Sequence, residues 1–202
     1  DETHNIDVQK IESLISDKTK AIIPVHFAGQ ACDMDEIYRI SKKYNLRVIE
    51  DAAHALPSYY KGQLVGNLKG SDITCFSFYA TKTLTTGEGG MITTNNAEYA
   101  ENMRVNRLHG ISKDAWKRYG TKGNWKYDVI DIGNKYNTTD INSAMGLVQL
   151  SKQGKLLEKR KKIGKRYFEA FKNNKNIINP FFKKDRESSW HLFVIKVENR
   201  DI

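Results

Sequence analysis

The sequence has few cysteines and no long apolar run, and each shortage excludes a class of protein. Cys32 and Cys75 each stand alone, without a CxxC pair or a histidine cluster, so we expect neither a disulfide framework nor a metal site. No apolar run approaches the ~20 residues that a helix needs to cross a bilayer, so no membrane partner is expected. The N-terminal residues lack a basic stretch followed by an apolar one, which argues against a secretory signal. The two isolated cysteines favour the reducing cytoplasm.

Charge is spread unevenly along a chain of otherwise soluble, globular composition. Residues 1–150 hold 18 Lys/Arg and 18 Asp/Glu, whereas residues 151–202 hold 15 and 6, so the C-terminal quarter supplies the whole net charge of +9. The run Lys159-Arg160-Lys161-Lys162 is typical of the solvated face of an amphipathic helix. Because no aromatic residues are interleaved with it, we do not expect nucleic-acid binding. A non-catalytic basic binding module with an acidic partner stays as an alternative.

Strand-like and helix-like runs alternate along the first 110 residues, which predicts an α/β fold with a parallel sheet. Residues 111–137 are loop-like, and loops of that length in compact domains are usually functional. A strand at 190–197 is expected to belong to a second domain, with the boundary in or near a long basic helix. The expected strands are 21–27, 46–50, 73–78, 90–94 and 190–197, and the expected helices begin at 33, 96, 140 and 153.

A carboxylate and an amine follow two of the expected strands. Asp51 ends the apolar strand 46–50 and is followed by two alanines, and Lys82 lies between strand 73–78 and the glycine-rich turn 87–90. Ligands of parallel α/β sheets bind at the carboxyl ends of the strands. Each residue also has an ordinary structural interpretation, Asp51 as a helix N-cap and Lys82 as solvated surface. Together they match pyridoxal chemistry, which needs an amine for the aldehyde and an acid for the ring nitrogen.

Four sequence blocks resemble the DegT/DnrJ/EryC1/StrS family of sugar aminotransferases, and the resemblance covers nearly the whole chain. The order and spacing of the blocks are more specific than any one of them. The blocks are Pro24-Val25-His26 with Gly29-Gln30 and Asp33-Met34; Glu50-Asp51-Ala52-Ala53-His54-Ala55; Ser77-Phe78-Tyr79-Ala80-Thr81-Lys82 with Gly87-Glu88-Gly89-Gly90; and Lys135-Tyr136-Asn137-Thr138-Thr139-Asp140-Ile141-Asn142-Ser143-Ala144.

The resemblance implies a role for five residues and for pyridoxal 5'-phosphate as the cofactor. Lys82 is implied to hold the cofactor covalently and Asp51 to pair with its pyridine nitrogen. His54 is implied to contact the cofactor ring or its hydroxyl, with a buried, hydrogen-bonded core histidine as the alternative. Ser77 is implied to bind the cofactor phosphate, and Asn137 to reach the phosphate in a neighbouring subunit. The similarity at His109 and His191 is too loose to assign either of them a role.

The resemblance also implies the fold and the reaction. Residues 1–152 would form part of a large cofactor-binding domain, a three-layer α/β/α structure with a mainly parallel sheet, and residues 153–202 a linking helix and the start of a smaller α+β domain. The implied reaction transfers an amino group from an amino acid, with L-glutamate expected, to a nucleotide-linked keto-sugar for surface polysaccharide or related amino-sugar biosynthesis. A homodimer with shared active sites is implied.

Two open points accompany the resemblance. The family's sugar dehydratases are the alternative, but they carry histidine where this chain has Lys82. Because family members are roughly twice as long, the sequence is expected to be an interior piece of a longer protein. The sequence does not identify the sugar, the nucleotide or the carbon that receives the nitrogen.

Overall fold

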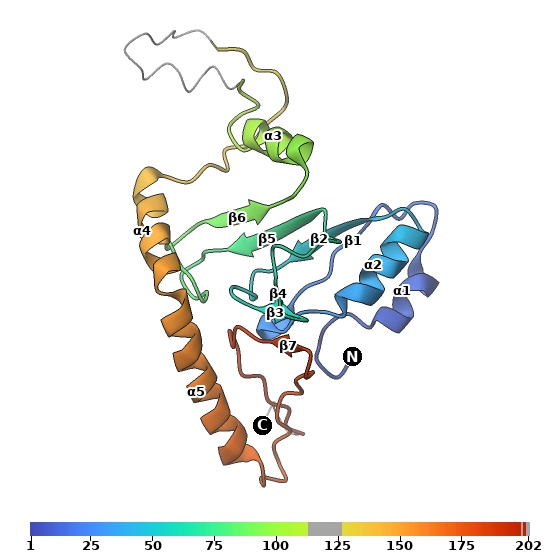
Figure 1. The fold of residues 1–202 in the computed structure, drawn as a ribbon, viewed down its shortest axis with the longest axis vertical. Helices are drawn as coiled ribbons and strands as arrows, with labels where there is room; N and C mark the ends of the chain where they lie inside the picture. Colours follow the sequence, from blue (N-terminus) through green and yellow to red (C-terminus); the bar gives the residue numbers. More distant parts are fainter. Residues whose placement is uncertain (113–126, 199, 201–202) are drawn as a thin grey trace.

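The computed structural model describes residues 1–112, 127–198 and 200 (Figure 1). The helices are α1 Val8–Leu14, the 3-10 turn η1 Phe27–Gly29, α2 Met34–Lys43, α3 Ala97–Asn106, α4 Asp140–Ser151 and α5 Gln153–Phe171. The strands are β1 Ala21–Ile22, β2 Arg47–Asp51, β3 Tyr59–Tyr60, β4 Gln63–Leu64, β5 Ile73–Ser77, β6 Gly90–Thr93 and β7 Arg186–Glu187.

The central sheet has the order β1-β2-β5-β6, and its first three strands are parallel. This confirms the expected α/β class and the mainly parallel sheet. The last strand, β6, runs antiparallel to β5 and is the edge strand of the sheet within the described residues. Strand β1 is shorter than the run 21–27, but pairing continues beyond it, because the N–H of His26 donates to the carbonyl of Asp51 at 3.0 Å.

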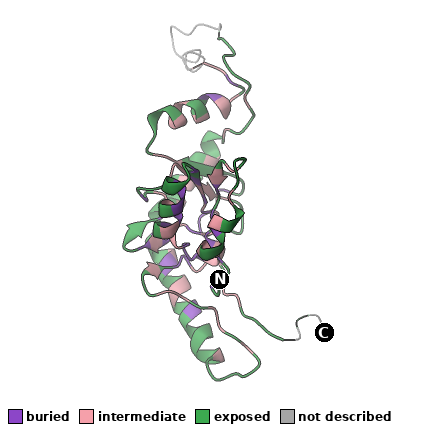
Figure 2. Ribbon diagram, turned by 90° about the vertical axis from the view of Figure 1, so that its right-hand side faces the viewer, coloured by how far each residue is buried: buried purple, intermediate pink, exposed green. Residues whose placement is uncertain are grey.

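The core lies between the sheet and α2. Ile37 and Ile40 of α2 and Val48 of β2 are fully buried, and burial of each such side chain stabilises the fold by about 1.5–3 kcal/mol. Figure 1 shows α1 and α2 together on one side of the sheet, with α4 and α5 running along the other. Burial is concentrated in the body of the molecule, whereas α3 and much of α4 and α5 are exposed (Figure 2).

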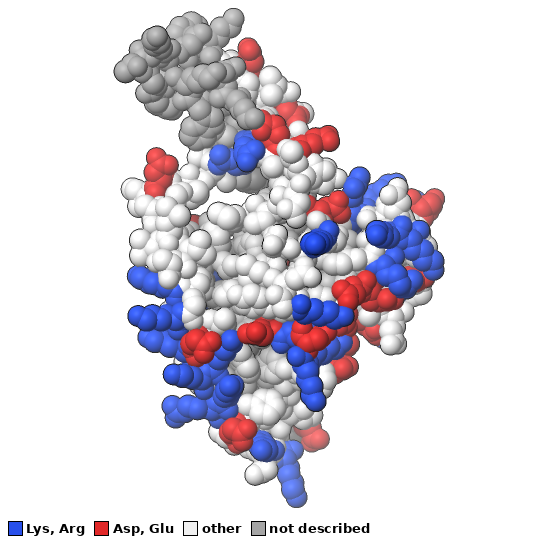
Figure 3. Space-filling model, viewed as in Figure 1, with Lys and Arg blue, Asp and Glu red and all other residues white. Residues whose placement is uncertain are grey.

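The later helices follow their sequence signals. The side chain of Asn96 caps α3 by accepting from the N–H of Tyr99, and that of Thr139 caps α4 by accepting from the N–H of Asn142. Helix α5 spans the residues expected from its periodicity, and its Lys and Arg side chains line one flank of the molecule (Figure 3). Within the described residues, no helix is long and apolar enough to cross a membrane.

The prediction of a strand at 190–197 was wrong. Only an isolated bridge between Ile178 and Lys196 forms there, and the strand of this region is β7, which joins β3 and β4 in a small antiparallel sheet. Trp190 has a left-handed backbone with φ of 54°, which interrupts an extended run. Residues 181–192 instead pack against η1 and β3. The division at residue 152 into two domains stays a prediction.

Candidate functional site

Asp51 lies at the carboxyl end of β2, at the edge of the sheet where β5 also ends. In the parallel pairing of these strands, Asp51 is opposite Cys75. The residues directly after Asp51 form turns and no helix, so the helix N-cap interpretation is wrong. One oxygen of its half-buried carboxylate accepts the N–H of Ala53 at 3.0 Å in a tight turn. This turn holds the side chain at the end of the strand and directs the chain on to His54.

Lys82 lies in a turn that follows β5. The turn is held by main-chain hydrogen bonds at 3.0 Å, from the N–H of Lys82 to the carbonyl of Tyr79 and from that of Thr86 to the carbonyl of Phe78. The lysine side chain is half-buried rather than fully solvated. The following loop returns to β6 through Gly87 and Gly89, both of which have positive φ angles that favour glycine.

The charges of Asp51 and Lys82 both act on the ring of His54. Burial lowers the pKa of His54, the Lys82 ammonium lowers it further, and the Asp51 carboxylate opposes both. Within the described residues, neither Lys82 nor Asp51 makes an ion pair within 4.0 Å. The amine and the acid therefore share one environment without neutralising each other. That arrangement suits an aromatic ring that is bound by the amine at one end and by the acid at the other.

His54 itself is held from two sides. Its Nδ1 accepts the N–H of Ala28 at 3.3 Å, and its carbonyl accepts the hydroxyl of Ser189 at 2.5 Å. Its ring lies 4.4 Å from that of His191 and 6.1 Å from that of Phe27, centroid to centroid. Burial, followed by His54, Lys82 and Arg160, lowers the pKa of His191 to about 4. His191 therefore belongs to the same group of side chains.

The residues present fit a pyridoxal group by the chemistry of the donor set. Lys82 offers a primary amine and Asp51 an acid, and Ala52 and Ala53 beside the acid carry no bulky side chain. The oxygen of Asp51 that does not accept from Ala53 has no hydrogen-bond partner within the described residues. It is therefore available to a protonated ring nitrogen.

The other two expected residues lie on different elements. Ser77 ends β5, next to the Lys82 turn, and its hydroxyl accepts the N–H of Tyr79 at 3.3 Å. Asn137 precedes α4, where its side-chain oxygen accepts from Lys135 and its side-chain nitrogen donates to the Thr138 carbonyl at 3.4 Å. Asn137 lines a groove between β6 and α3, and within the described residues no hydrogen bond joins its side chain to Lys82 or Asp51.

A buried polar network supports the strand that carries Asp51. His26 and Glu50 are both fully buried, and Nε2 of the histidine lies 2.6 Å from a Glu50 oxygen. Nδ1 of His26 accepts the N–H of Cys32 at 3.1 Å, so the ring proton sits on Nε2 and is donated to Glu50. The other Glu50 oxygen accepts from Ser71 and, at 3.1 Å, from Thr74. The network thus joins β2 and β5 to the segment that follows β1.

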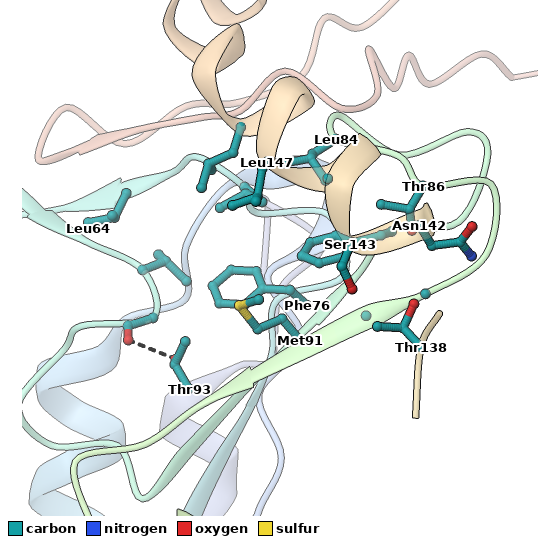
Figure 4. Close-up of a pocket in the computed structure, with 18 of the residues that line it drawn as sticks. Leu64, Phe76, Leu84, Thr86, Met91, Thr93, Thr138, Asn142, Ser143 and Leu147 are labelled. Carbon is teal, nitrogen blue, oxygen red and sulfur yellow. Dashed lines mark hydrogen bonds between the residues drawn. The ribbon is translucent and has the colours of Figure 1, made fainter. Parts of the chain in front are cut away.

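An apolar cavity of about 390 Å³ lies between α4 and the β5–β6 pair (Figure 4). Phe76, Met91 and Leu147 point into it. Lys82 and Asp51 are not among its lining residues, so the cavity lies beside the candidate site rather than in it.

Two residues of the site could not be assigned from the sequence. His191 and Arg160 lie far along the chain from Asp51 and reach the site only through tertiary packing. The one available signal for His191 was the block Trp190-His191-Leu192-Phe193, and for Arg160 there was only a run of basic residues. The part of the long loop at 113–126 lies outside the described residues.

Comparisons with known proteins agree with the resemblance. The model of the DegT/DnrJ/EryC1/StrS aminotransferase family matches residues 1–202. The chain is 46% identical to the spore coat polysaccharide biosynthesis protein SpsC of Bacillus subtilis, over 98% of this chain and 50% of that protein. The chain thus spans about half the length of this curated relative.

Solved structures show the same fold. PseC of Helicobacter pylori, an aminotransferase involved in the biosynthesis of pseudoaminic acid, matches with a TM-score of 0.89 and 34% identity, over 99% of this chain and 51% of that one. The PLP form of Spr1654 from Streptococcus pneumoniae matches with a TM-score of 0.84 and 35% identity, over 96% of this chain and 52% of that one.

Proposed function

This chain belongs to the DegT/DnrJ/EryC1/StrS aminotransferase family, and on that premise we propose that it carries the central part of a pyridoxal-phosphate-dependent sugar aminotransferase. The observation that supports this most directly is the shared environment of Lys82 and Asp51, which act on His54 in opposite senses without pairing with each other. We propose further that the acceptor is a nucleotide-linked keto-sugar and that the donor is an amino acid, L-glutamate first. The similarity to SpsC supports a role in polysaccharide biosynthesis.

Each proposed role follows from the chemistry of the side chain. When bound, pyridoxal phosphate supplies an aldehyde that carries the amino group and a ring that takes up the electron pair left at the donor's α-carbon. Lys82 would hold that aldehyde through its amine. When free, the same amine would act as the base that removes the proton from the donor's α-carbon and as the acid that later gives the proton back. Asp51 pairs with the ring nitrogen and keeps that nitrogen protonated.

His54 and Ser77 orient the cofactor. His54 is half-buried and held by Ala28 and Ser189, so its ring has a fixed direction next to Lys82. Its lowered pKa keeps the ring neutral near pH 7, which suits contact with an aromatic group. Ser77, at the end of β5, supplies a hydroxyl for the cofactor phosphate.

We propose a homodimer in which Asn137 of one subunit completes the site of the other. Within the described residues, the side chain of Asn137 bonds to Lys135 and Thr138 and not to Lys82 of its own chain, which supports a role outside that site. The adjacent α4 exposes several large apolar side chains, including Ile141 at 80% and Leu147 at 71%. Apolar surface of this kind is typical of a face that another surface covers.

The test uses the full-length protein. Purified protein is expected to show the absorbance of a lysine-bound cofactor and to convert a nucleotide keto-sugar to the amino sugar with glutamate. Lys82→Ala is expected to abolish both signals. Asp51→Asn is expected to keep the cofactor but slow the donor step by about 10- to 100-fold, because the ring nitrogen loses its negatively charged partner. Retention of the absorbance in Lys82→Ala, or a deoxy-sugar product without nitrogen, would contradict the proposal.

A further inference from the structure

The guanidinium of Arg160 is half-buried on α5 and has no partner within the described residues, neither a hydrogen bond nor an ion pair within 4.0 Å. Its neighbours on the helix differ. Lys161 pairs with Glu158 and Glu187, and Arg166 is exposed. Burial lowers the pKa of the Arg160 guanidinium, which means that the site disfavours the charge it holds. A charge in such a place is expected to meet a counter-ion.

Arg160 lies on the face of α5 that is turned towards the candidate site. At about 100° per residue, Gln153, Leu157, Arg160 and Gly164 fall within about 60° of one another around the helix. Gln153 donates to the carbonyl of Thr83, the residue after Lys82, at 3.3 Å. At the other end of the stripe, a Cβ on Gly164 would lie 2.3 Å from the Trp190 ring. Arg160 thus lies between the Lys82 turn and the segment that carries His191.

The surroundings of Arg160 are rich in nitrogen groups. Its charge and that of Lys82 both act on His191, whose ring lies 4.4 Å from that of His54 between centroids. Among the described residues, the carboxylate that acts on His54 is that of Asp51, whose proposed partner is the ring nitrogen of the cofactor. Once Asp51 is paired in that way, the cation of Arg160 remains for a substrate anion.

We propose, resting on the function proposed above, that Arg160 binds the carboxylate of the amino acid donor and of the oxo-acid it becomes. A planar guanidinium matches a carboxylate with two parallel hydrogen bonds. Phosphate has the same chemistry, but the position of Arg160 favours the donor. The α-carboxylate is bonded directly to the carbon that must lie beside Lys82, whereas the diphosphate of a nucleotide sugar is separated from the reacting carbon by the sugar ring.

The experiment compares Arg160→Gln and Arg160→Lys with Arg166→Gln in the full-length, cofactor-loaded enzyme. Arg166→Gln removes the same charge from an exposed position of the same helix. Calorimetry measures the Kd of glutarate, a dicarboxylate that cannot react, and stopped-flow absorbance measures the donor step with glutamate alone. Arg160→Gln is expected to raise the Kd of glutarate and the apparent KM of glutamate by about 10- to 100-fold. Arg160→Lys is expected to recover part of the loss, and Arg166→Gln to change neither value.

The outcomes separate this inference from the proposed function. Unchanged glutarate and glutamate binding in Arg160→Gln would overturn the inference while leaving the transaminase intact. A loss confined to the nucleotide-sugar step would assign Arg160 to phosphate and overturn it equally. A wild-type enzyme with neither cofactor absorbance nor turnover would instead sink the proposed function. Circular dichroism checks that each variant is folded, and Arg160→Lys carries the test if Arg160→Gln is not.

Discussion

The imidazole rings of His54 and His191 lie 4.4 Å apart between centroids and are inclined by 36°. One ring belongs to the turn after β2 and the other to the segment after β7, so the pair joins two distant parts of the chain at the candidate site. The segment is attached by a further set of hydrogen bonds. Ser189 donates from its N–H to Ser58 at 3.1 Å, and Ser58 donates to the carbonyl of Gly29 at 2.6 Å. The histidine pair therefore rests on a framework of buried serines.

The pair predicts how stability depends on pH. Burial and nearby cations lower the pKa of His191 from its ordinary 6.5 to about 4. Between these two pH values, His191 is therefore protonated in the unfolded chain but not in the folded protein. Stability is then lost as pH falls from about 6.5 towards about 4. His191→Phe is expected to flatten this part of the curve in thermal unfolding of the full-length protein. His109→Asn, at an exposed histidine, is the control and should leave the curve unchanged. An identical pH dependence in His191→Phe and wild type would refute the prediction.

Much of the fold was predictable because local signals and tertiary packing agree. Helix α5 has the bounds that its periodicity indicated, and the ends of β2 and β5 meet because parallel strands end at one edge of a sheet. The placement of Asp51 and Lys82 at that edge follows from the same rule.

The failures lie where distant contacts decide the conformation. The run from Trp190 to Val197 is apolar and resembles a strand, but Leu192 donates to the carbonyl of Ala28 at 3.4 Å and Trp190 takes a left-handed backbone. These interactions involve residues more than 150 positions away, which no periodicity records. For the same reason, His191 and Arg160 could be recognised as members of the site only in three dimensions.

Gly29 is predicted to be essential to the attachment of the C-terminal segment. Its φ is +100°, and an added Cβ would lie 2.0 Å from the hydroxyl of Ser189. Gly29→Ala is expected to lower the free energy of unfolding by about 1–3 kcal/mol more than Gly62→Ala does. Gly62 is the matched control, because its φ is +77° and nothing lies within 4 Å of its added Cβ. Urea unfolding of the full-length protein measures both. Equal losses would show that only backbone strain matters at Gly29.

The buried carboxylate of Glu50 predicts a second stability effect. It accepts from His26, Ser71 and Thr74 and is fully buried, so Glu50→Gln turns one acceptor into a donor with no exit to water. A loss of about 1–3 kcal/mol in the free energy of unfolding is expected. Glu36→Gln, which breaks an exposed pair with Arg39 on α2, is expected to change stability little. The measurement is chemical denaturation of each full-length variant, and equal stability of Glu50→Gln and wild type would contradict the expectation.

Shared active sites predict that two inactive variants restore each other. Lys82→Ala removes the amine from one site, and Asn137→Ala removes the side chain that we propose reaches the other subunit's site. In a mixed dimer, the site that combines Lys82 of one subunit with Asn137 of the other keeps both groups, while its twin loses both. About half of the sites are thus expected to be intact in the purified mixed dimer, compared with about a quarter in an unfractionated random mixture of equal amounts. The two variants, carrying different affinity tags, are co-expressed at full length and assayed for turnover after purification through both tags, which enriches the mixed dimer. Activity no higher than that of the separate variants would place Asn137 in the site of its own chain, or outside the site altogether.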